Sequence, residues 1–458
     1  MFTCPSDYVV NLNQLDWKEN KLEQNKYYAL LITAIIVTII FSLGCNSTPT
    51  NGTAEDAFTK ETVRDLSKIT PQLINDLDSK IDNYLQIKND PTLLEEAAES
   101  RKNLTIITEA YEIGLKEALI SGNDDQKHIA AMALGFLNSK VQMKETVLLL
   151  LKMITKGIED DEQRYRALIG LMLMEKALKF YGFDDEGNPT KERDEMLYAI
   201  AYNLSNEKID RIRTTAAITL GYALNKDEKP NIVDALILRL SEEIETDTKV
   251  WVIFALAEIG TKKGLDAIAY QAMNDNDPSV RVEAVVMLGQ SMKTEYIPLL
   301  LKKLEDKEAA IRMQTIMYLT GFRNIEEKRS EISDAIEQLL NDSDYKVRMW
   351  ATVALGDLGE KKTVNRLIAK LGDRELNVQI AAVQSLGKLA DERAIEPLIK
   401  AMASKNEELR KRCRLALSRI TGADWGESTL EWQNWFDAGM PPVSPEKKAI
   451  LETDTDKE

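Results

Sequence analysis

The stretch Asp277–Gly289 reads DPSVRVEAVVMLG, and its pattern returns as DYKVRMWATVALG at Asp344–Gly356 and as ELNVQIAAVQSLG at Glu375–Gly387. In each copy an aliphatic residue precedes an Arg or Gln, a small residue follows three positions later, and a leucine follows four positions after that. Self-similarity at a regular spacing is the sequence signature of a repeat architecture. This leucine therefore serves as the anchor from which the rest of the chain is aligned.

Nine leucines occupy the anchor position, and the shortest spacing between them is 31 residues. They are Leu134, Leu173, Leu220, Leu256, Leu288, Leu319, Leu355, Leu386 and Leu417. Four positions before the anchor, the residues are mostly small. Seven positions before it, eight of nine residues are basic, and Gln379 is the exception. This basic column consists of Lys127, Arg166, Arg213, Lys249, Arg281, Arg312, Arg348 and Arg410.

A second apolar stretch follows each anchor, as in Thr294–Leu304, Lys362–Leu371 and Glu392–Met402. Its apolar residues recur at the spacing of a helix with one buried face. Each repeat is therefore predicted to be a helical hairpin. Asp277 before Pro278 predicts an N-cap, and we expect Gly289, Gly356 and Gly387 to loosen the end of the first helix.

The copies resemble HEAT repeats, in particular the short bacterial form with the pattern D-P-x-V-R-x-x-A-x-x-A-L-G first recognised in phycobilin lyases. The resemblance covers roughly residues 120–420 and is strong from Asp277 to Thr421. It implies hairpins that stack into a curved superhelix whose grooves bind other macromolecules. A lone hairpin buries too little apolar surface to be stable, whereas stacked hairpins share one core. We therefore predict an all-α fold, an α-solenoid of about nine HEAT-like hairpins over residues 121–420.

The basic column has two interpretations. We expect each basic side chain to pack its stem on a neighbour and to bond an Asp or a helix-end carbonyl in the next repeat. The alternative is a row of anion-binding sites along the array.

Both ends of the array differ from the repeats. Residues 54–120 have a helical pattern without the repeat signature and are predicted to form two or three capping or divergent helices. Residues 421–440 contain Trp425, Trp432 and Trp435, half of all the tryptophans, and resemble a tail that follows HEAT arrays in bacterial exported proteins. This segment is predicted to cap the last repeat, or alternatively to present aromatic side chains to a partner. Residues 441–458 are predicted to be disordered.

An uncharged run of 17 residues, Tyr27–Leu43, lies near the start of the chain. As a helix it spans about 25 Å, less than a hydrocarbon core of about 30 Å. Together with Gly44 and Cys45 it resembles a bacterial lipobox, which implies a signal peptide at residues 1–44 and lipid attachment at Cys45. Residues 45–53 then form a polar tether.

Two features depart from the lipobox pattern. Ser42 stands where leucine is usual, and the residues before the run are numerous and acidic. A gene model that begins too early would explain the second feature. A single membrane-spanning anchor is the alternative, and either interpretation predicts a location in the bacterial cell envelope.

Composition argues against most enzyme classes. The chain of 458 residues has one histidine, His128, and three cysteines, and it contains no nucleotide-binding, metalloprotease or hydrolase motif. Its net charge of -16 makes nucleic acid an unfavourable partner. Cys413 is predicted to be a packed thiol, and His128 to be exposed on a helix. An insertion at Tyr181–Glu195 is predicted to be a solvated loop, with a weak cation site as the alternative.

Three functional hypotheses follow. The first is a membrane-tethered scaffold that binds an unidentified protein or peptide, without cofactor or catalytic residues. The second is a chromophore-lyase-like enzyme or enzyme subunit, which rests only on the resemblance. The third is a purely structural envelope protein.

Overall fold

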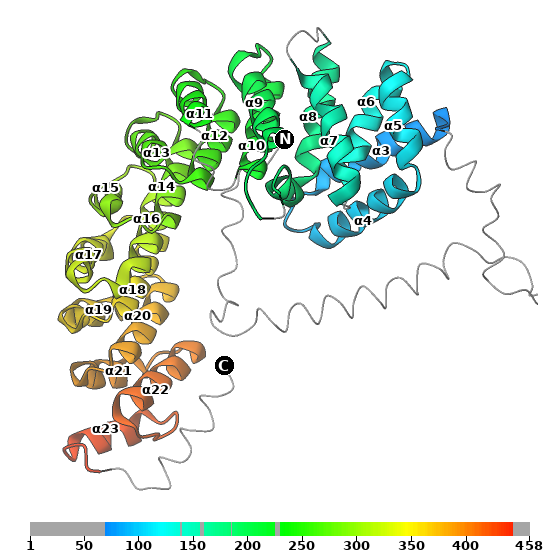
Figure 1. Ribbon diagram of the computed structural model, residues 1–458. Coiled ribbons are helices and arrows are strands. Elements are labelled where there is room, and N and C mark those ends of the chain that lie inside the picture. The colour runs from blue at the N-terminus through cyan, green and yellow to red at the C-terminus, as the bar shows by residue number, and fades with distance from the viewer. Residues whose placement is uncertain (1–68, 138–139, 156–159, 185, 225–229, 443–458) are drawn as a thin grey trace, which may run out of the picture. The chain divides into compact units, whose positions relative to one another are not determined.

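The computed structural model describes residues 69–137, 140–155, 160–184, 186–224 and 230–442 (Figure 1). Within these ranges the secondary structure is helical, apart from one isolated bridge between Phe183 and Pro189. None of the described helices is long and apolar enough to cross a membrane. The predicted signal peptide, Cys45, the tether at 45–53, residues 54–68 and residues 443–458 lie outside the described residues.

The chain divides into two compact units at Ala177 and Leu178, within the range predicted as one array. The described helices of the first unit are α3 (Pro71–Ile87), α4 (Leu94–Ala110), α5 (Glu112–Ser121), α6 (Asp124–Ala133), α7 (Lys140–Ile154) and α8 (Asp161–Leu173). Helices α3, α5 and α8 all pack on α6. Helix α3 buries Ile74, Leu77, Ile81 and Tyr84, which recur every three or four residues along one face.

The second unit, Leu178–Glu458, contains the repeats in two layers. The first-helix layer consists of α10 (Asp210–Ala223), α12 (Thr246–Ile259), α14 (Pro278–Gln290), α16 (Ala309–Gly321), α18 (Tyr345–Leu358), α20 (Leu376–Leu389) and α22 (Glu407–Thr421). The second-helix layer consists of α11 (Pro230–Glu242), α13 (Lys262–Asn274), α15 (Ile297–Lys303), α17 (Glu326–Gln338), α19 (Val364–Lys370), α21 (Ile395–Ala401) and α23 (Thr429–Asp437). Helix α9 (Lys191–Asn206) precedes them and packs on α10 and α11.

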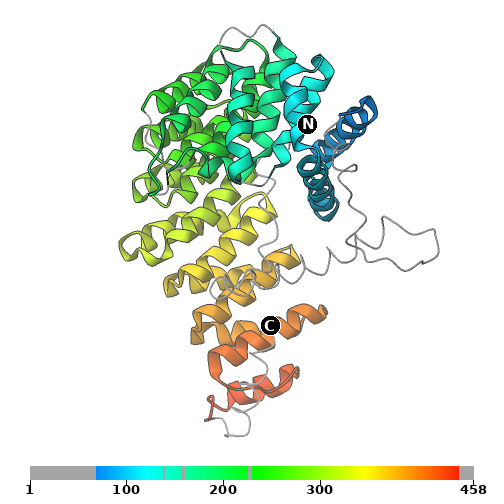
Figure 2. The same ribbon diagram turned by 45° about the vertical axis from the view of Figure 1, so that its right-hand side comes forward.

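Each first helix packs against the first helix of the next repeat, from α10 to α22. In Figure 1 the helices of the two layers lie in two separate rows, and the turned view in Figure 2 shows the helices coloured yellow to red stacked one after another. The predicted all-α solenoid of hairpins is confirmed by this arrangement.

Close packing within the first-helix layer depends on small residues. Ala284, Ala351 and Ala382, four positions before their anchors, are fully buried. A Cβ atom on Gly289 would lie 2.2 Å from Cγ of Tyr318 on the next first helix, and one on Gly356 would lie 2.6 Å from Cβ of Ser385. Gly289 and Gly356 lie in the last turns of α14 and α18, which end at Gln290 and Leu358. Their role is to let neighbouring helices approach closely.

Helix ends follow the expected chemistry. Asp277 caps α14 by accepting a hydrogen bond from the backbone N–H of Ser279 at 2.8 Å, as predicted. Gly260, Gly359 and Gly422 end α12, α18 and α22 with positive φ angles between 69° and 76°. Ala390 takes this left-handed position after α20, with φ 48°.

Candidate interaction surface

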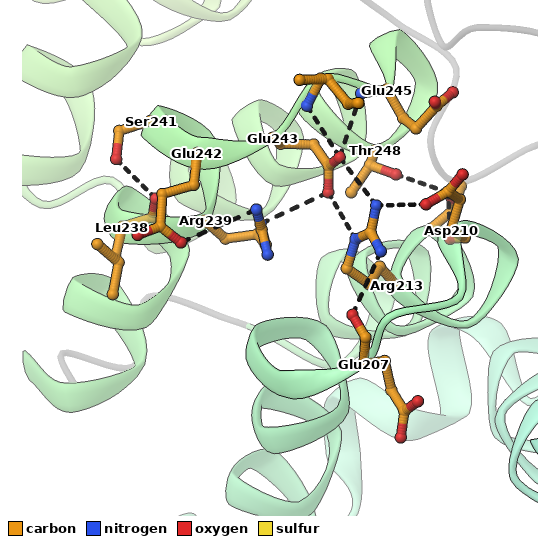
Figure 3. A network of polar contacts seen from close by, with 12 residues as sticks. Glu207, Asp210, Arg213, Leu238, Arg239, Ser241, Glu242, Glu243, Glu245 and Thr248 are labelled. Atoms are coloured by element: carbon orange, nitrogen blue, oxygen red, sulfur yellow. Dashed lines mark hydrogen bonds and ion pairs between the residues drawn. The ribbon is translucent and has the colours of Figure 1, made fainter.

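The basic column forms a ladder of ion pairs inside the second unit, and Arg213 shows its geometry (Figure 3). From α10, its Nε donates to Glu243 Oε2 at 2.9 Å and its Nη2 donates to Glu243 Oε1 at 3.1 Å. Its Nη1 donates to the backbone carbonyl of Lys208, in the turn before its own helix, at 2.9 Å. Glu243 Oε1 also accepts the backbone N–H groups of Ile244 and Glu245. One guanidinium thus joins two consecutive inter-repeat turns.

The same contacts recur along the array. Each rung joins a basic residue of a first helix to an acidic residue in the turn before the next repeat. The rungs are Arg213–Glu243, Lys249–Asp275, Arg281–Asp306, Arg312–Asp342 and Arg348–Asp373. Each of the five carboxylates also accepts the backbone N–H of the residue two positions later, which fixes the turn.

The next repeat along the chain, which contains Gln379, has no described ion pair at this position of the ladder. Gln379 replaces the arginine and donates through Nε2 to the carbonyl of Asp373 at 2.6 Å. Ser404 stands where the carboxylate would be, and its hydroxyl accepts the N–H of Asn406. Arg410 donates to the carbonyls of Ser404 and Lys405, and no described carboxylate pairs with it. Gln379 and Ser404 thus replace the basic and the acidic member of the same rung, and both are neutral.

Burial and hydrogen bonding have opposite effects on the pKa values of the acidic residues in the ladder. Burial would raise the pKa of Asp306, but hydrogen bonds from Arg281, Lys303 and the N–H of Glu308 outweigh it and lower the pKa to about 2. The pKa of Asp342 and that of Asp373 are lowered for the same reasons. These carboxylates are ionised at neutral pH and neutralise the arginines they face.

The anion-binding alternative therefore has little support in the second unit, because the charges of these five rungs are already paired. In the first unit, Arg166 pairs with Glu162 on its own helix. Lys127 takes part in no ion pair among the described residues. The expected pairing with an Asp of the next repeat is confirmed for Lys249, Arg281, Arg312 and Arg348, and Arg213 pairs with a glutamate instead. The sequence analysis did not name these acidic residues, although a signal exists: an acidic residue stands six positions before Arg213, Lys249, Arg281, Arg312, Arg348 and Gln379.

A second feature that sequence reasoning missed is an apolar ridge on the first-helix layer. It occupies the positions six, five and two residues before the anchors, which lie on one side of each helix. All of its side chains are half-buried. They are Trp251, Phe254, Val282, Met313, Met317, Met349, Trp350, Val353 and Ile380.

The ridge spans five consecutive first helices, from α12 to α20. Aromatic contacts extend it to α10, since the ring of Trp251 packs edge-on against both Tyr222 and Phe254 at centroid distances of 5.9 and 5.6 Å. Methionine and tryptophan make up five of its nine residues. Both residue types are common at protein-binding surfaces, because methionine adapts its shape and tryptophan buries a large area.

Glu283 lies at a ridge position but is fully buried. Neither of its carboxyl oxygens has a hydrogen-bond partner among the described residues. Burial raises its pKa to about 7. Gln314, at the equivalent position of α16, also has an Oε1 without a described partner. Two polar groups at ridge positions are therefore buried without a hydrogen-bond partner among the described residues.

The ridge positions become basic at α22. A hollow of about 210 Å³ between α20 and α22 is lined by Gln384, Gly387, Lys388, Arg412, Leu415, Ala416 and Arg419. Gln384 and Leu415 stand two residues before their anchors, and Arg412 stands five before, so the hollow continues the ridge. We call Lys388, Arg412 and Arg419 the basic end.

The tryptophans of residues 421–440 occupy a different place. Trp432 is fully buried and Trp435 is 7% exposed, so neither presents a free aromatic surface. Their indole N–H groups donate to the carbonyls of Gly426 and Pro441. Trp425 packs against Trp435, with ring centroids 6.4 Å apart. Helix α23, which carries two of the three, packs on α21 of the preceding repeat.

The remaining candidate residues show no reactive arrangement. Cys413 is fully buried, and burial raises the pKa of its thiol to about 12. His128 is largely buried rather than exposed as expected, since its side chain is 16% exposed, and its Nε2 lies 3.6 Å from Asp160. Among the described residues no cluster of His, Cys, Asp or Glu could hold a metal ion.

The predicted insertion is shorter than expected, because α9 begins at Lys191. In the turn before α9, Asp184 accepts the N–H groups of Glu186 and Asn188, which closes the loop on itself. Asp184, Glu186 and Asn188 are all exposed, as a solvated loop requires.

A family model described as HEAT repeats matches residues 233–320 and 332–418. No curated protein matches the chain. Among solved structures, it is similar to that of a Kap95:Nup1 complex, with 14% identity, a TM-score of 0.52, and coverage of 82% of this chain and 53% of the other.

It is also similar to a structure in which Kap95p binding induces the switch loops of RanGDP to adopt the GTP-bound conformation. That match has 13% identity, a TM-score of 0.51, and coverage of 76% of this chain and 51% of the other. The chain thus spans about half the length of these proteins, and the similarity shows the fold. The protein is an all-α solenoid, and its residues 233–320 and 332–418 match the HEAT-repeat family.

Proposed function

We propose that this protein is a scaffold that binds a protein partner through the first-helix layer of its second unit. The observation that carries the proposal is the apolar ridge, which has partly exposed apolar side chains on each of five consecutive helices. Soluble monomers rarely leave a long apolar stripe open unless it binds something. The regular rungs join consecutive repeats and so fix the spacing of the helices, which makes the ridge a preorganised surface.

The similar solved structures support this use of the architecture. Kap95 is in complex with Nup1 in one of them, and in the other Kap95p binding induces the switch loops of RanGDP to adopt the GTP-bound conformation. Repeat solenoids bind macromolecules along extended surfaces that the stacking of the repeats creates. A protein partner is therefore the class that suits this ridge best.

The second part of the proposal concerns location. Gly44-Cys45 after an uncharged run supports a lipid anchor at Cys45, with residues 46–53 as a tether to the described helices. Metabolic labelling with a fatty-acid analogue tests it in the wild type and in Cys45→Ala. We expect label in the wild type alone. Equal labelling of both proteins, or of neither, would remove the anchor from the proposal.

Cross-linked membranes of the native host provide the test of the scaffold. The bait is the full chain, either as wild type or with the ridge substitutions Met317→Lys and Trp350→Lys. The control bait carries Leu238→Lys and Tyr270→Lys, two exposed apolar residues of the second-helix layer. Circular dichroism confirms that all three baits are folded.

We expect a reproducible partner with the wild type and the control, and its loss with the ridge variant. Two positive charges on an apolar contact surface oppose its burial. A partner that binds all three baits alike would place the binding site elsewhere. If no bait captures a partner, the purely structural role becomes the better explanation.

A further inference from the structure

Charge is distributed unevenly along the second unit. Residues 361–420 contain 14 Lys and Arg against 7 Asp and Glu, a net charge of +7 in a chain of net charge -16. The last repeats are therefore strongly basic, while the remainder of the chain is strongly acidic. Such separation creates a local field that attracts groups of the opposite sign.

Part of this charge lies in the same surface as the apolar ridge. Arg412 on α22 occupies the position that Trp251 holds on α12 and Trp350 holds on α18. Leu415 occupies the position of Phe254 and Val353. A segment that follows the first-helix layer from α12 to α22 thus meets apolar side chains first and cationic side chains afterwards.

The cations of the basic end are accessible. Lys388 is 47% exposed and pairs with Asp357, and Arg412 is 33% exposed and pairs with Glu408 on its own helix. Arg419 is exposed and has no ion pair among the described residues. Exposed pairs of this kind contribute little stability, so an incoming carboxylate can replace them at small cost.

The ridge itself adds little opposing charge. Glu283 is its only acidic position, and it is covered and unpaired. No described carboxylate lines the hollow at the basic end. The surface is therefore apolar along most of its length and cationic at one end.

We propose that the apolar ridge and the basic end together bind an acidic segment of a protein partner, one that carries apolar side chains followed by aspartates and glutamates. This assignment rests on the proposed scaffold function and names the chemistry of the partner. The apolar residues bury against the ridge, which supplies affinity. The carboxylates meet Lys388, Arg412 and Arg419, which set the direction and the rate of binding.

Selection from a displayed library of random 16-residue peptides on the full chain tests the assignment. The test variant carries Lys388→Glu, Arg412→Glu and Arg419→Glu. The control variant has the same change of charge on the second-helix layer and its turns, through Lys362→Glu, Arg366→Glu and Lys400→Glu. These control residues are also exposed and ion-paired, at 38%, 70% and 69% exposure. Thermal unfolding confirms that both variants fold.

We expect the wild type to enrich peptides with large apolar residues and with Asp and Glu about twofold above the input. The control should enrich the same peptides, and the test variant should lose the acidic preference. The best peptide should bind the test variant about tenfold more weakly than the control at moderate ionic strength, as removal of three rim charges implies.

Several results would overturn the assignment. Enrichment of basic or uncharged apolar peptides on the ridge would refute the acidic partner while leaving the scaffold intact. Equal binding of single-stranded DNA of similar charge would make the basic end a general polyanion site. Binding about tenfold tighter after removal of residues 443–458 would identify that segment of the chain as the occupant. Absence of any enriched peptide would refute the docking surface itself.

Discussion

At the scale of single residues, the ladder explains why the repeats tolerate so many buried charges. Arg348 and Asp373 are 6% and 7% exposed, and each guanidinium nitrogen that points inward has an acceptor. Removal of one partner of such a pair leaves the other charge buried without compensation, which costs far more than the pair contributes. The arginines are therefore structural joints between repeats.

Arg348→Ala is expected to lower the free energy of unfolding by about 3 kcal/mol, because Asp373 then lacks its counter-charge. Arg410→Ala is the matched control, since Arg410 occupies the same position but has no described carboxylate partner, and we expect a loss of about 1 kcal/mol from its carbonyl contacts. Urea denaturation of both variants measures the difference. Equal losses would show that the carboxylate contacts add nothing.

The raised pKa of Glu283 makes stability fall as pH rises, whereas the lowered pKa values of the ladder carboxylates make stability fall as pH drops. Its folded pKa of about 7 lies above the unfolded value of about 4.3, so the folded chain retains a proton that the unfolded chain releases. The contribution of this group to the free energy of unfolding is fully present below about pH 4 and is lost as pH rises towards 7. Glu283→Gln should therefore gain about 2 kcal/mol relative to wild type between pH 4.5 and pH 8.

Unfolding in urea at both pH values tests this prediction, with the exposed Glu305→Gln as control. The control should differ from wild type by the same amount at both pH values. A Glu283→Gln variant that behaves like the control would show that the carboxyl finds a partner or water in solution.

At the scale of helices, the residue that ends the first helix distinguishes otherwise similar repeats. Three first helices end on glycine in the left-handed region, whereas α20 ends on Ala390 with φ 48°. A side chain at positive φ costs roughly 1 kcal/mol, which glycine avoids. Helix α20 therefore has a strained end that its neighbours lack.

Ala390→Gly is expected to raise stability by about 0.5 kcal/mol, because relief of strain exceeds the added entropy of the unfolded chain. Gly359→Ala, at φ 76° with no atom within 4 Å of the new Cβ, should lower it by about 1 kcal/mol. Thermal unfolding measures both. Opposite signs are the expected result, and a destabilising Ala390→Gly would contradict the explanation.

Gly289 tests the close approach of neighbouring first helices. Gly289→Ala places a Cβ 2.2 Å from Tyr318 Cγ and should cost about 2 kcal/mol. The same change in a Tyr318→Ala background should cost much less, because the clash is gone. Gly321→Ala, at the end of α16 and 3.7 Å from the nearest side chain, is the control and should be neutral or stabilising. Urea denaturation measures the stability of the four variants. An equal cost of Gly289→Ala in both backgrounds would contradict the close approach of the two helices as its cause.

At the scale of the whole molecule, the sequence predicted the architecture because stacked hairpins repeat one solution of the packing problem. The anchors, the small column and the basic column each recur; the anchors and the small column are buried in the second unit, and the basic column is buried or partly buried. The caps followed from local chemistry, as Asp277 illustrates. The division at Ala177 could not be predicted, because it depends on contacts between distant residues.

The functional surface was harder to predict for a physical reason. Met317 and Trp350 have the composition of a core, and only their half-exposure in the assembled layer identifies them as a surface. The close approach of Gly289 to Tyr318 could not be predicted, because it depends on where the neighbouring helix lies. The tryptophans near the end of the chain attracted attention by their density, yet two of them are buried.

Photo-crosslinking from single positions in the full chain, within cells of the native host, tests the central claim most directly. A photoreactive phenylalanine replaces Trp350 on the ridge or Arg366, which is 70% exposed on the second-helix layer. The scaffold account predicts a discrete protein adduct from position 350 and none from position 366. Adducts from position 366 alone, or none from position 350 in a folded and correctly located protein, would contradict it.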